Sequence, residues 1–133
     1  MQTEGLDHLV LSVSDLERSR KFYGELLGFE LHDFPLDYPD ALCAGSTYFV
    51  VGGVEINLIH HPQTPPGDRF DERRIGLDHL SFRAPDEAAL HALAEKLLRA
   101  GVHTQGVETY GPNNKQYVAF RDPDNIQLEY WLN

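Results

Sequence analysis

Two histidines stand at the same place in two copies of one pentapeptide. Gly5–Leu9 and Gly76–Leu80 both read Gly-Leu-Asp-His-Leu, which separates His8 from His79 by about seventy residues. The imidazole ring titrates near neutral pH and is the commonest metal ligand among the side chains. The repeat therefore makes these two histidines the first candidates for a ligand site.

Strand alternation predicts where the two imidazoles point, because successive side chains of a strand lie on opposite faces. In each copy three apolar side chains share one face: Leu9, Leu11 and Val13, and then Leu80, Phe82 and Ala84. His8 and His79 fall on the other face of their strands. We expect the helix that follows each strand to cover the apolar face, so both histidines should point away from it, to the concave side of a sheet.

A carboxylate near the C-terminus is the third candidate. Residues 126–131 alternate as a strand in which Glu129 shares a face with Gln127 and Trp131. A buried carboxylate needs a partner such as a cation or a metal. In the corresponding strand of the first half, the same alternation places Glu55 and Asn57 on one face.

Two helices are predicted to position these strands. Apolar side chains form one helical stripe over residues 16–27, broken by polar residues, and a cleaner stripe over residues 90–98. Ser14 with Glu17 predicts a capping box for the first helix, and Asp86 is the expected cap of the second.

Further strands follow each helix. Residues 46–61 are typical of a hairpin that turns at Gly52 and Gly53, and residues 115–120 and 126–131 flank a turn at 121–125. Each half therefore runs strand, helix, and then more strands. We predict an α+β fold of two tandem βαβββ modules, whose curved mixed sheets surround a cleft and carry their helices on the outer face.

The module boundaries follow from composition. We predict one domain over 1–133, with a first module over about 5–61, a linker over 62–74 rich in proline and charge, and a second module over about 75–132. Within the first module, residues 34–45 are expected to begin as a loop and to end as a strand.

Composition excludes several classes of partner. The chain has 133 residues and a net charge of −10 without a basic cluster, which disfavours nucleic acid and anionic membranes. No signal peptide or membrane-spanning run is visible, and a lone Cys43 cannot form an internal disulfide. We expect a cytoplasmic protein that binds a small molecule.

The pattern as a whole resembles a known superfamily. The twofold module, the opening DHLVLSVSDLERSRKFYGELLGFEL and the ending FRDPDNIQLEYW are similar to the vicinal oxygen chelate superfamily. That group includes glyoxalase I, extradiol dioxygenases, fosfomycin-resistance enzymes and bleomycin-binding proteins. The resemblance covers nearly the whole chain.

The resemblance implies a metal site. In the metalloenzymes of this superfamily, the first strand of each module supplies a histidine and the last strand of the second supplies a glutamate. Carried over, these ligands are His8, His79 and Glu129. Two imidazoles and one carboxylate suit a divalent first-row metal and leave positions open for substrate and for water or oxygen. Fe²⁺ or Mn²⁺ is favoured, with Zn²⁺ or Ni²⁺ as alternatives.

The chain also departs from each branch of the superfamily. Glyoxalase I usually has a fourth ligand, a glutamate, where Asn57 stands here, and an amide is a weak ligand and a poor base. Fosfomycin enzymes carry a threonine two residues after the first histidine, where this chain has Val10. Extradiol enzymes place a tyrosine where this chain has Ala119, and Tyr117 on the same face is the expected substitute donor.

The remaining roles are assigned by face. Glu129 and Tyr117 are the candidate catalytic residues. Substrate contacts are assigned to four side chains: Asn57, Arg83, Arg121 and Trp131. A salt bridge to a neighbouring carboxylate is the equal alternative for each arginine.

These residues together predict a metal-dependent enzyme that acts on a small molecule with vicinal oxygens, with extradiol-type dioxygenase chemistry favoured. A glyoxalase I-like lyase and a metal-free drug-binding protein of the bleomycin-resistance kind stay open. By analogy with small members of the superfamily, a homodimer is expected.

Overall fold

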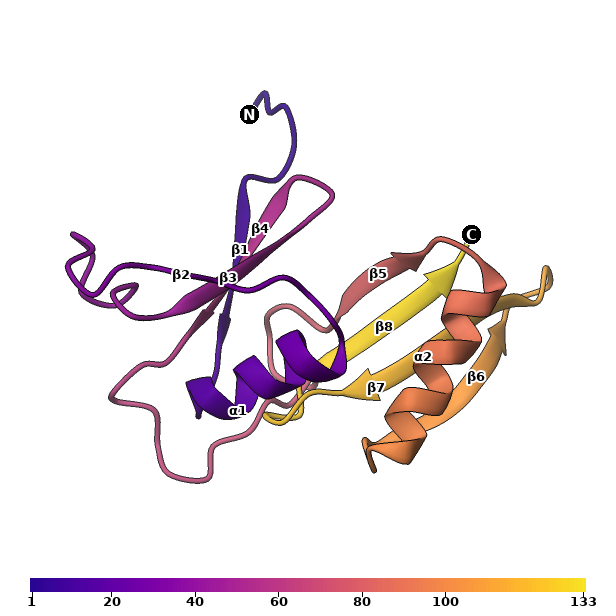
Figure 1. The fold of residues 1–133 in the computed structure, drawn as a ribbon. Helices are drawn as coiled ribbons and strands as arrows, with labels where there is room; N and C mark the ends of the chain where they lie inside the picture. Colours follow the sequence, from indigo (N-terminus) through magenta and orange to yellow (C-terminus); the bar gives the residue numbers. More distant parts are fainter. The chain divides into compact units, whose positions relative to one another are not determined.

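The computed structural model describes all residues from Met1 to Asn133 as two compact units, Met1–Asp68 and Arg69–Asn133 (Figure 1). Each unit consists of a four-stranded open sheet and a helix, in the chain order strand, helix and three strands. This architecture confirms the predicted α+β fold of two βαβββ modules. No helix has the length and apolarity needed to cross a membrane.

The first unit is built on a sheet in the order β1-β4-β3-β2. Its elements are β1 (His8–Ser12), α1 (Leu16–Arg20), the π-helical segment η1 (Lys21–Leu26), β2 (His32–Asp33), β3 (Thr47–Val51) and β4 (Val54–Ile59). Strands β1 and β4 are parallel, and the other pairs are antiparallel. Gly52 and Gly53 both adopt positive φ angles, as the predicted tight turn between β3 and β4 requires.

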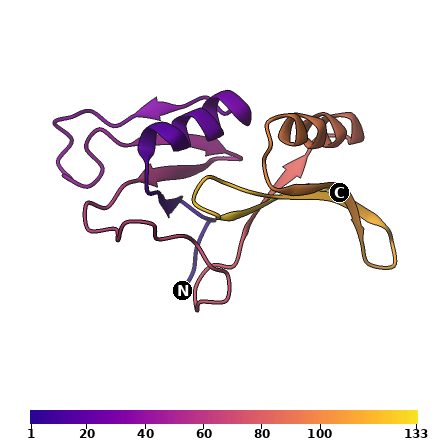
Figure 2. The ribbon, with the colours of Figure 1, turned by 90° about the horizontal axis from the view of Figure 1, so that it is seen from below.

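The second unit repeats this topology in the order β5-β8-β7-β6. Its elements are β5 (Leu80–Ala84), α2 (Glu87–Arg99), β6 (Thr104–Tyr110), β7 (Lys115–Arg121) and β8 (Gln127–Leu132). Strands β5 and β8 are parallel. Helix α2 lies across one face of the sheet and contacts all four of its strands (Figure 2).

Each core lies between a helix and the apolar face of its sheet. Phe49 in β3 is fully buried and stacks on Tyr23 and Phe29, while Leu90 of α2 and Leu128 of β8 are fully buried in the second unit. Burying a side chain of this size contributes about 1.5–3 kcal/mol. The opposite face of each sheet, called here the helix-free face, carries the polar side chains that the alternation predicted.

The first helix cap differs from the prediction. Asp15, not Ser14, is the N-cap: its backbone is extended and its carboxylate accepts the amide of Arg18 at 2.9 Å. The hydroxyl of Ser14 instead accepts a hydrogen bond from the Arg18 guanidinium at 2.8 Å. At the second helix the prediction is confirmed, since Asp86 accepts the amide of Ala89.

The expectation of a strand at the end of residues 34–45 is wrong. The segment turns throughout, and β3 begins only at Thr47. Near its end the amides of Cys43 and Ser46 donate locally, to Asp40 and Cys43, and only Phe34 at its start pairs across the segment, with Gly45 and Ser46. Backbone groups that are paired within a turn are not available to a ladder.

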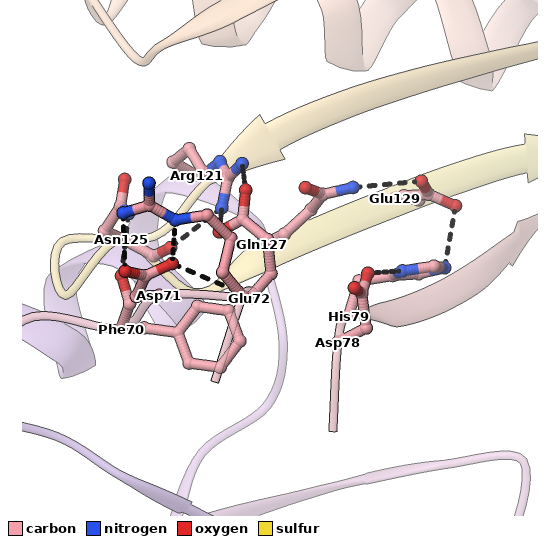
Figure 3. A network of polar contacts seen from close by, with 10 residues as sticks. Phe70, Asp71, Glu72, Asp78, His79, Arg121, Asn125, Gln127 and Glu129 are labelled. Atoms are coloured by element: carbon pink, nitrogen blue, oxygen red, sulfur yellow. Dashed lines mark hydrogen bonds and ion pairs between the residues drawn. The ribbon is translucent and has the colours of Figure 1, made fainter. Parts of the chain in front are cut away.

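The linker has no regular structure, but its end is anchored in the second unit. The amide of Phe70 donates to the carbonyl of Asp124. The side-chain amide of Asn125 donates to the carbonyl of Phe70 at 2.9 Å (Figure 3). The boundary between the units accordingly follows Asp68. The turn between β7 and β8 thus holds the segment that leads towards His79.

Candidate metal centre

His79 and Glu129 meet on the helix-free face of the second unit. Glu129 lies in the middle of β8 and is only 8% exposed, and His79 immediately precedes β5. The parallel register sets Ser81 opposite Glu129, so the imidazole is two residues away along the neighbouring strand. Its Nε2 lies 3.5 Å from Oε2 of Glu129 (Figure 3).

Two further side chains hold the carboxylate of Glu129. The indole Nε1 of Trp131 donates to Oε2 at 2.6 Å, and the amide of Gln127 donates to Oε1 at 3.3 Å. Both donors come from the same face of β8, where alternate residues are neighbours. The buried carboxylate is therefore oriented by its own strand.

The first unit offers a corresponding site with a different side chain. His8 begins β1, and the register sets Val10, two residues later, opposite Asn57 of β4. In the second unit the residue two after His79 stands opposite Glu129 in the same way. Asn57 therefore occupies the register position of Glu129. It is 7% exposed, and its Oδ1 has no hydrogen-bond partner.

The residues present fit a divalent metal by their donor chemistry. Neither unit by itself gathers three histidine, cysteine or acidic side chains around one point. The second unit supplies the pair of His79 and Glu129, and His8 belongs to the first unit. Nitrogen and carboxylate oxygen together are donors that Fe²⁺, Mn²⁺, Zn²⁺ and Ni²⁺ accept.

Tyr117 lies beside this pair. Its ring stacks on Trp131, with centroids 4.6 Å apart and planes at 12°, and the register sets it opposite Glu108. Burial, and then the negative charges of Glu108 and Glu129, raise the pKa of the Tyr117 phenol above its usual value of 10.0. The phenol thus stays protonated at neutral pH and is able to donate a hydrogen bond.

The two arginines assigned to substrate have different surroundings. Arg121 donates to both carboxylate oxygens of Glu72, at 2.9 and 3.0 Å, and to the carbonyl of Asn125 (Figure 3). The same contact holds the pKa of Glu72 below its usual value. Arg121 thus forms the salt bridge that was its alternative role. Arg83 is exposed on β5, next to Trp131 in the register, with no carboxylate against it.

Sequence reasoning missed four side chains that hold these groups. Asp7 and Asp78 contact His8 and His79, Gln127 contacts Glu129, and Glu72 pairs with Arg121. For the two aspartates a signal was present, because the repeated pentapeptide carries Asp before each His. Glu72 gave no local signal, since it lies in the linker, far along the chain from Arg121.

The family assignment rests on a match over nearly the whole chain. The model of the glyoxalase/bleomycin resistance protein/dioxygenase superfamily matches residues 5–130. The chain belongs to this superfamily. The resemblance drawn from the repeat and from the C-terminal motif is thereby confirmed.

Relatives within the superfamily include enzymes. Glutathione transferase FosA of Serratia marcescens is 31% identical, over 95% of this chain and 79% of its own. Metallothiol transferase FosB of Lysinibacillus sphaericus (strain C3-41) is 26% identical, over 98% of this chain and 83% of its own. A glyoxylase/bleomycin resistance protein/dioxygenase domain from Frankia sp. EAN1pec has a similar structure, with a TM-score of 0.80 and 33% identity over 99% of each chain.

Proposed function

We propose that this protein is a divalent-metal enzyme that acts on a small molecule with two adjacent oxygens, with His8, His79 and Glu129 as its metal ligands. The observation that carries the proposal is the 3.5 Å separation of His79 Nε2 and Glu129 Oε2. Two ligand atoms that are each about 2.1 Å from one metal lie about 3.0–3.4 Å apart in octahedral or tetrahedral geometry. The pair thus needs little movement to share an ion.

The metal would act as a Lewis acid for the two substrate oxygens. The side chains around it supply the remaining functions. Tyr117 is a protonated phenol near Glu129 with Glu108 as a hydrogen-bond partner, and it is suited to exchange that partner for a substrate oxygen. Asn57 offers a buried amide oxygen with no protein partner, which suits a donor group of the substrate.

Arg83 favours an anionic or phenolic substrate. The first unit carries its cations only in the helical segment, at Arg18, Arg20 and Lys21. In the second unit Glu72 neutralises Arg121, whereas Arg83 has no acidic partner on the helix-free face. A free guanidinium on a chain of net charge −10 is a specific attraction for a carboxylate or a phenolate.

Among reaction classes, we favour extradiol-type oxygen chemistry on Fe²⁺ or Mn²⁺. A lyase of the glyoxalase kind uses carboxylates to move a substrate proton, and the register position in the first unit that matches Glu129 carries the amide of Asn57. An amide does not act as a base at neutral pH. Ring cleavage with oxygen needs no such base at this position, so the glyoxalase I-like lyase becomes the alternative.

The first experiment is metal analysis of protein that is purified without oxygen or chelator. About one iron or manganese ion per chain is expected, and the His79→Ala variant should lose it because it lacks one of three ligands. His91→Ala, which removes an exposed histidine of α2, is the matched control and should keep the metal. No metal in the native chain, even after reconstitution, would overturn the proposal and favour a metal-free drug-binding protein.

Oxygen uptake with catechols then separates the reaction classes. Uptake that depends on Fe²⁺ or Mn²⁺ would support the dioxygenase. Turnover of the hemithioacetal of methylglyoxal without oxygen uptake, on Zn²⁺ or Ni²⁺, would reverse the preference in favour of the lyase.

Thiol transfer is a second candidate, because FosA is 31% identical over nearly the whole of this chain. Consumption of glutathione in the presence of an electrophilic small molecule, with no oxygen uptake, would identify it. We also propose a homodimer, which light scattering of the purified chain would test.

A further inference from the structure

Each histidine of the proposed metal site contacts the aspartate that precedes it. Nδ1 of His79 lies 2.6 Å from Oδ1 of Asp78, and Nδ1 of His8 lies 2.7 Å from Oδ1 of Asp7 (Figure 3 shows the first of these pairs). Both contacts come from the repeated Asp-His dipeptide. In both, it is Nδ1, not Nε2, that meets the carboxylate.

The chemistry of the two groups identifies the donor. An ionised carboxylate only accepts hydrogen bonds, so Nδ1 must carry the proton. A neutral imidazole has one N–H, which leaves Nε2 with a free lone pair. In His79 that nitrogen faces Oε2 of Glu129 at 3.5 Å, a long distance for a hydrogen bond. Two electron-rich atoms at this separation are suited to coordinate one cation between them.

The same contact arises twice, in two separately packed units. The other histidines do not share it: His60 directs Nδ1 at the carbonyl of Val13, and His91 approaches Glu87 through Nε2. Of the seven histidines in the chain, the two on the proposed metal site are the ones held at Nδ1 by a carboxylate. This restriction to the two proposed ligands favours a role at the proposed metal site over a general feature of surface histidines.

We propose that Asp7 and Asp78 are positioning residues that hold His8 and His79 in the Nδ1–H tautomer and present Nε2 to the metal. A carboxylate on the far nitrogen also raises the basicity of the ligating one, and partners of this kind are typically worth about 10–100-fold in metal affinity. The inference rests on the proposed function for its effect on metal binding. Its tautomer part concerns the metal-free chain alone.

The tautomer is measured by long-range ¹H–¹⁵N NMR of the histidine rings in the full chain, stripped of metal, at a pH where the imidazoles are neutral. His8 and His79 should show the Nδ1–H form. Asp7→Ala and Asp78→Ala should each shift the following histidine alone towards the Nε2–H form. Asp78→Asn keeps an acceptor oxygen and should retain the Nδ1–H form. The Nε2–H form at both histidines of the native chain would overturn the proposal.

Metal affinity is the second readout, by Mn²⁺ titration of the same proteins. Asp78→Ala should weaken binding about 10–100-fold, and Asp78→Asn less, because its amide accepts the hydrogen bond without the charge. Glu87→Ala is the matched control, since it removes an exposed carboxylate beside His91 on α2 and should leave the affinity unchanged.

The outcomes separate the two proposals. If the native chain binds Mn²⁺ and both alanine variants bind it with the same affinity, the proposed role of the aspartates is overturned. The proposed metal site itself would not be affected by that result. A native chain that binds no metal would overturn the proposed function, and the NMR result would then decide the tautomer assignment independently.

Discussion

The indole Nε1 of Trp131 donates to Oε2 of Glu129 at 2.6 Å, within a single face of β8. The sequence predicts that Trp131 contacts the substrate. In the structure its N–H is bonded to the carboxylate that we propose as a metal ligand, and its ring stacks on Tyr117. One side chain thus links the orientation of the glutamate to that of the phenol.

Trp131→Phe should therefore lower metal affinity at the proposed site more than it lowers the stability of the fold. Phenylalanine keeps an aromatic ring against Tyr117 but has no donor for Glu129, and a hydrogen bond to a charged group is worth about 1.5–3 kcal/mol. We expect metal affinity to fall at least about tenfold. Metal titration and thermal unfolding would measure the two effects. Tyr110→Phe, which alters another ring beside Trp131, is the control and should leave the affinity unchanged.

Replacing Arg121 by glutamine should affect stability, whereas replacing Arg83 by glutamine should affect substrate binding. Arg121→Gln leaves Glu72 without its partner and should lower the stability of the fold slightly, because a solvent-screened ion pair contributes little. Arg83→Gln breaks no salt bridge and should change stability by less than about 0.5 kcal/mol. It should instead raise the KM for a carboxylated catechol about tenfold or more, with little effect on catechol itself.

Thermal unfolding and steady-state kinetics of both variants check this pair of predictions. Equal KM values for the carboxylated catechol in native and Arg83→Gln protein would exclude Arg83 from substrate binding.

Asn57 is expected to lower the stability of the free protein. Its buried Oδ1 lacks a partner, and an unsatisfied buried polar group costs about 1–3 kcal/mol. Asn57→Leu has a similar size and no polar atom, so it should raise the melting temperature while it impairs turnover. A lower melting temperature would show that the amide is satisfied in solution, contrary to this expectation.

The Asn57→Asp variant tests whether position 57 is the counterpart of Glu129 in the first unit. It introduces a carboxylate at the position that matches Glu129, so a divalent metal should bind more tightly. The metal-free variant should be less stable than the native chain, because a buried charge without a partner is costly. Metal titration and unfolding with and without Mn²⁺ would show both effects.

Glu72 should contribute to the acid sensitivity of the second unit. Its pKa in the folded chain is held below the usual 4.5 by Arg121. A carboxyl with a lowered pKa stabilises the fold above its unfolded pKa, and that contribution is lost as the pH falls through its folded pKa. Unfolding measured from neutral pH to below 4.5 should therefore show a smaller pH dependence in Glu72→Gln than in the native chain. Parallel curves would contradict the expectation.

Local patterns were enough to predict most of the architecture. The alternation of apolar side chains around His8 and His79, the stripe of α2, the paired glycines at 52–53 and the cap at Asp86 all depend on neighbours a few residues apart. The repeat added the relation between the two halves. The predicted ligands and their faces follow from the same short-range information, joined to the resemblance to a family.

The side-chain partners were decided only by the tertiary structure. Whether Arg121 or Arg83 is neutralised depends on Glu72, which reaches β7 from the linker, and no periodicity relates residues 49 positions apart. The choice of Asp15 over Ser14 as the cap depends on the backbone angles at the start of the helix. Alternation predicts the face of Trp131 but not the direction of its N–H, because rotamers are selected by packing against neighbours such as Tyr117.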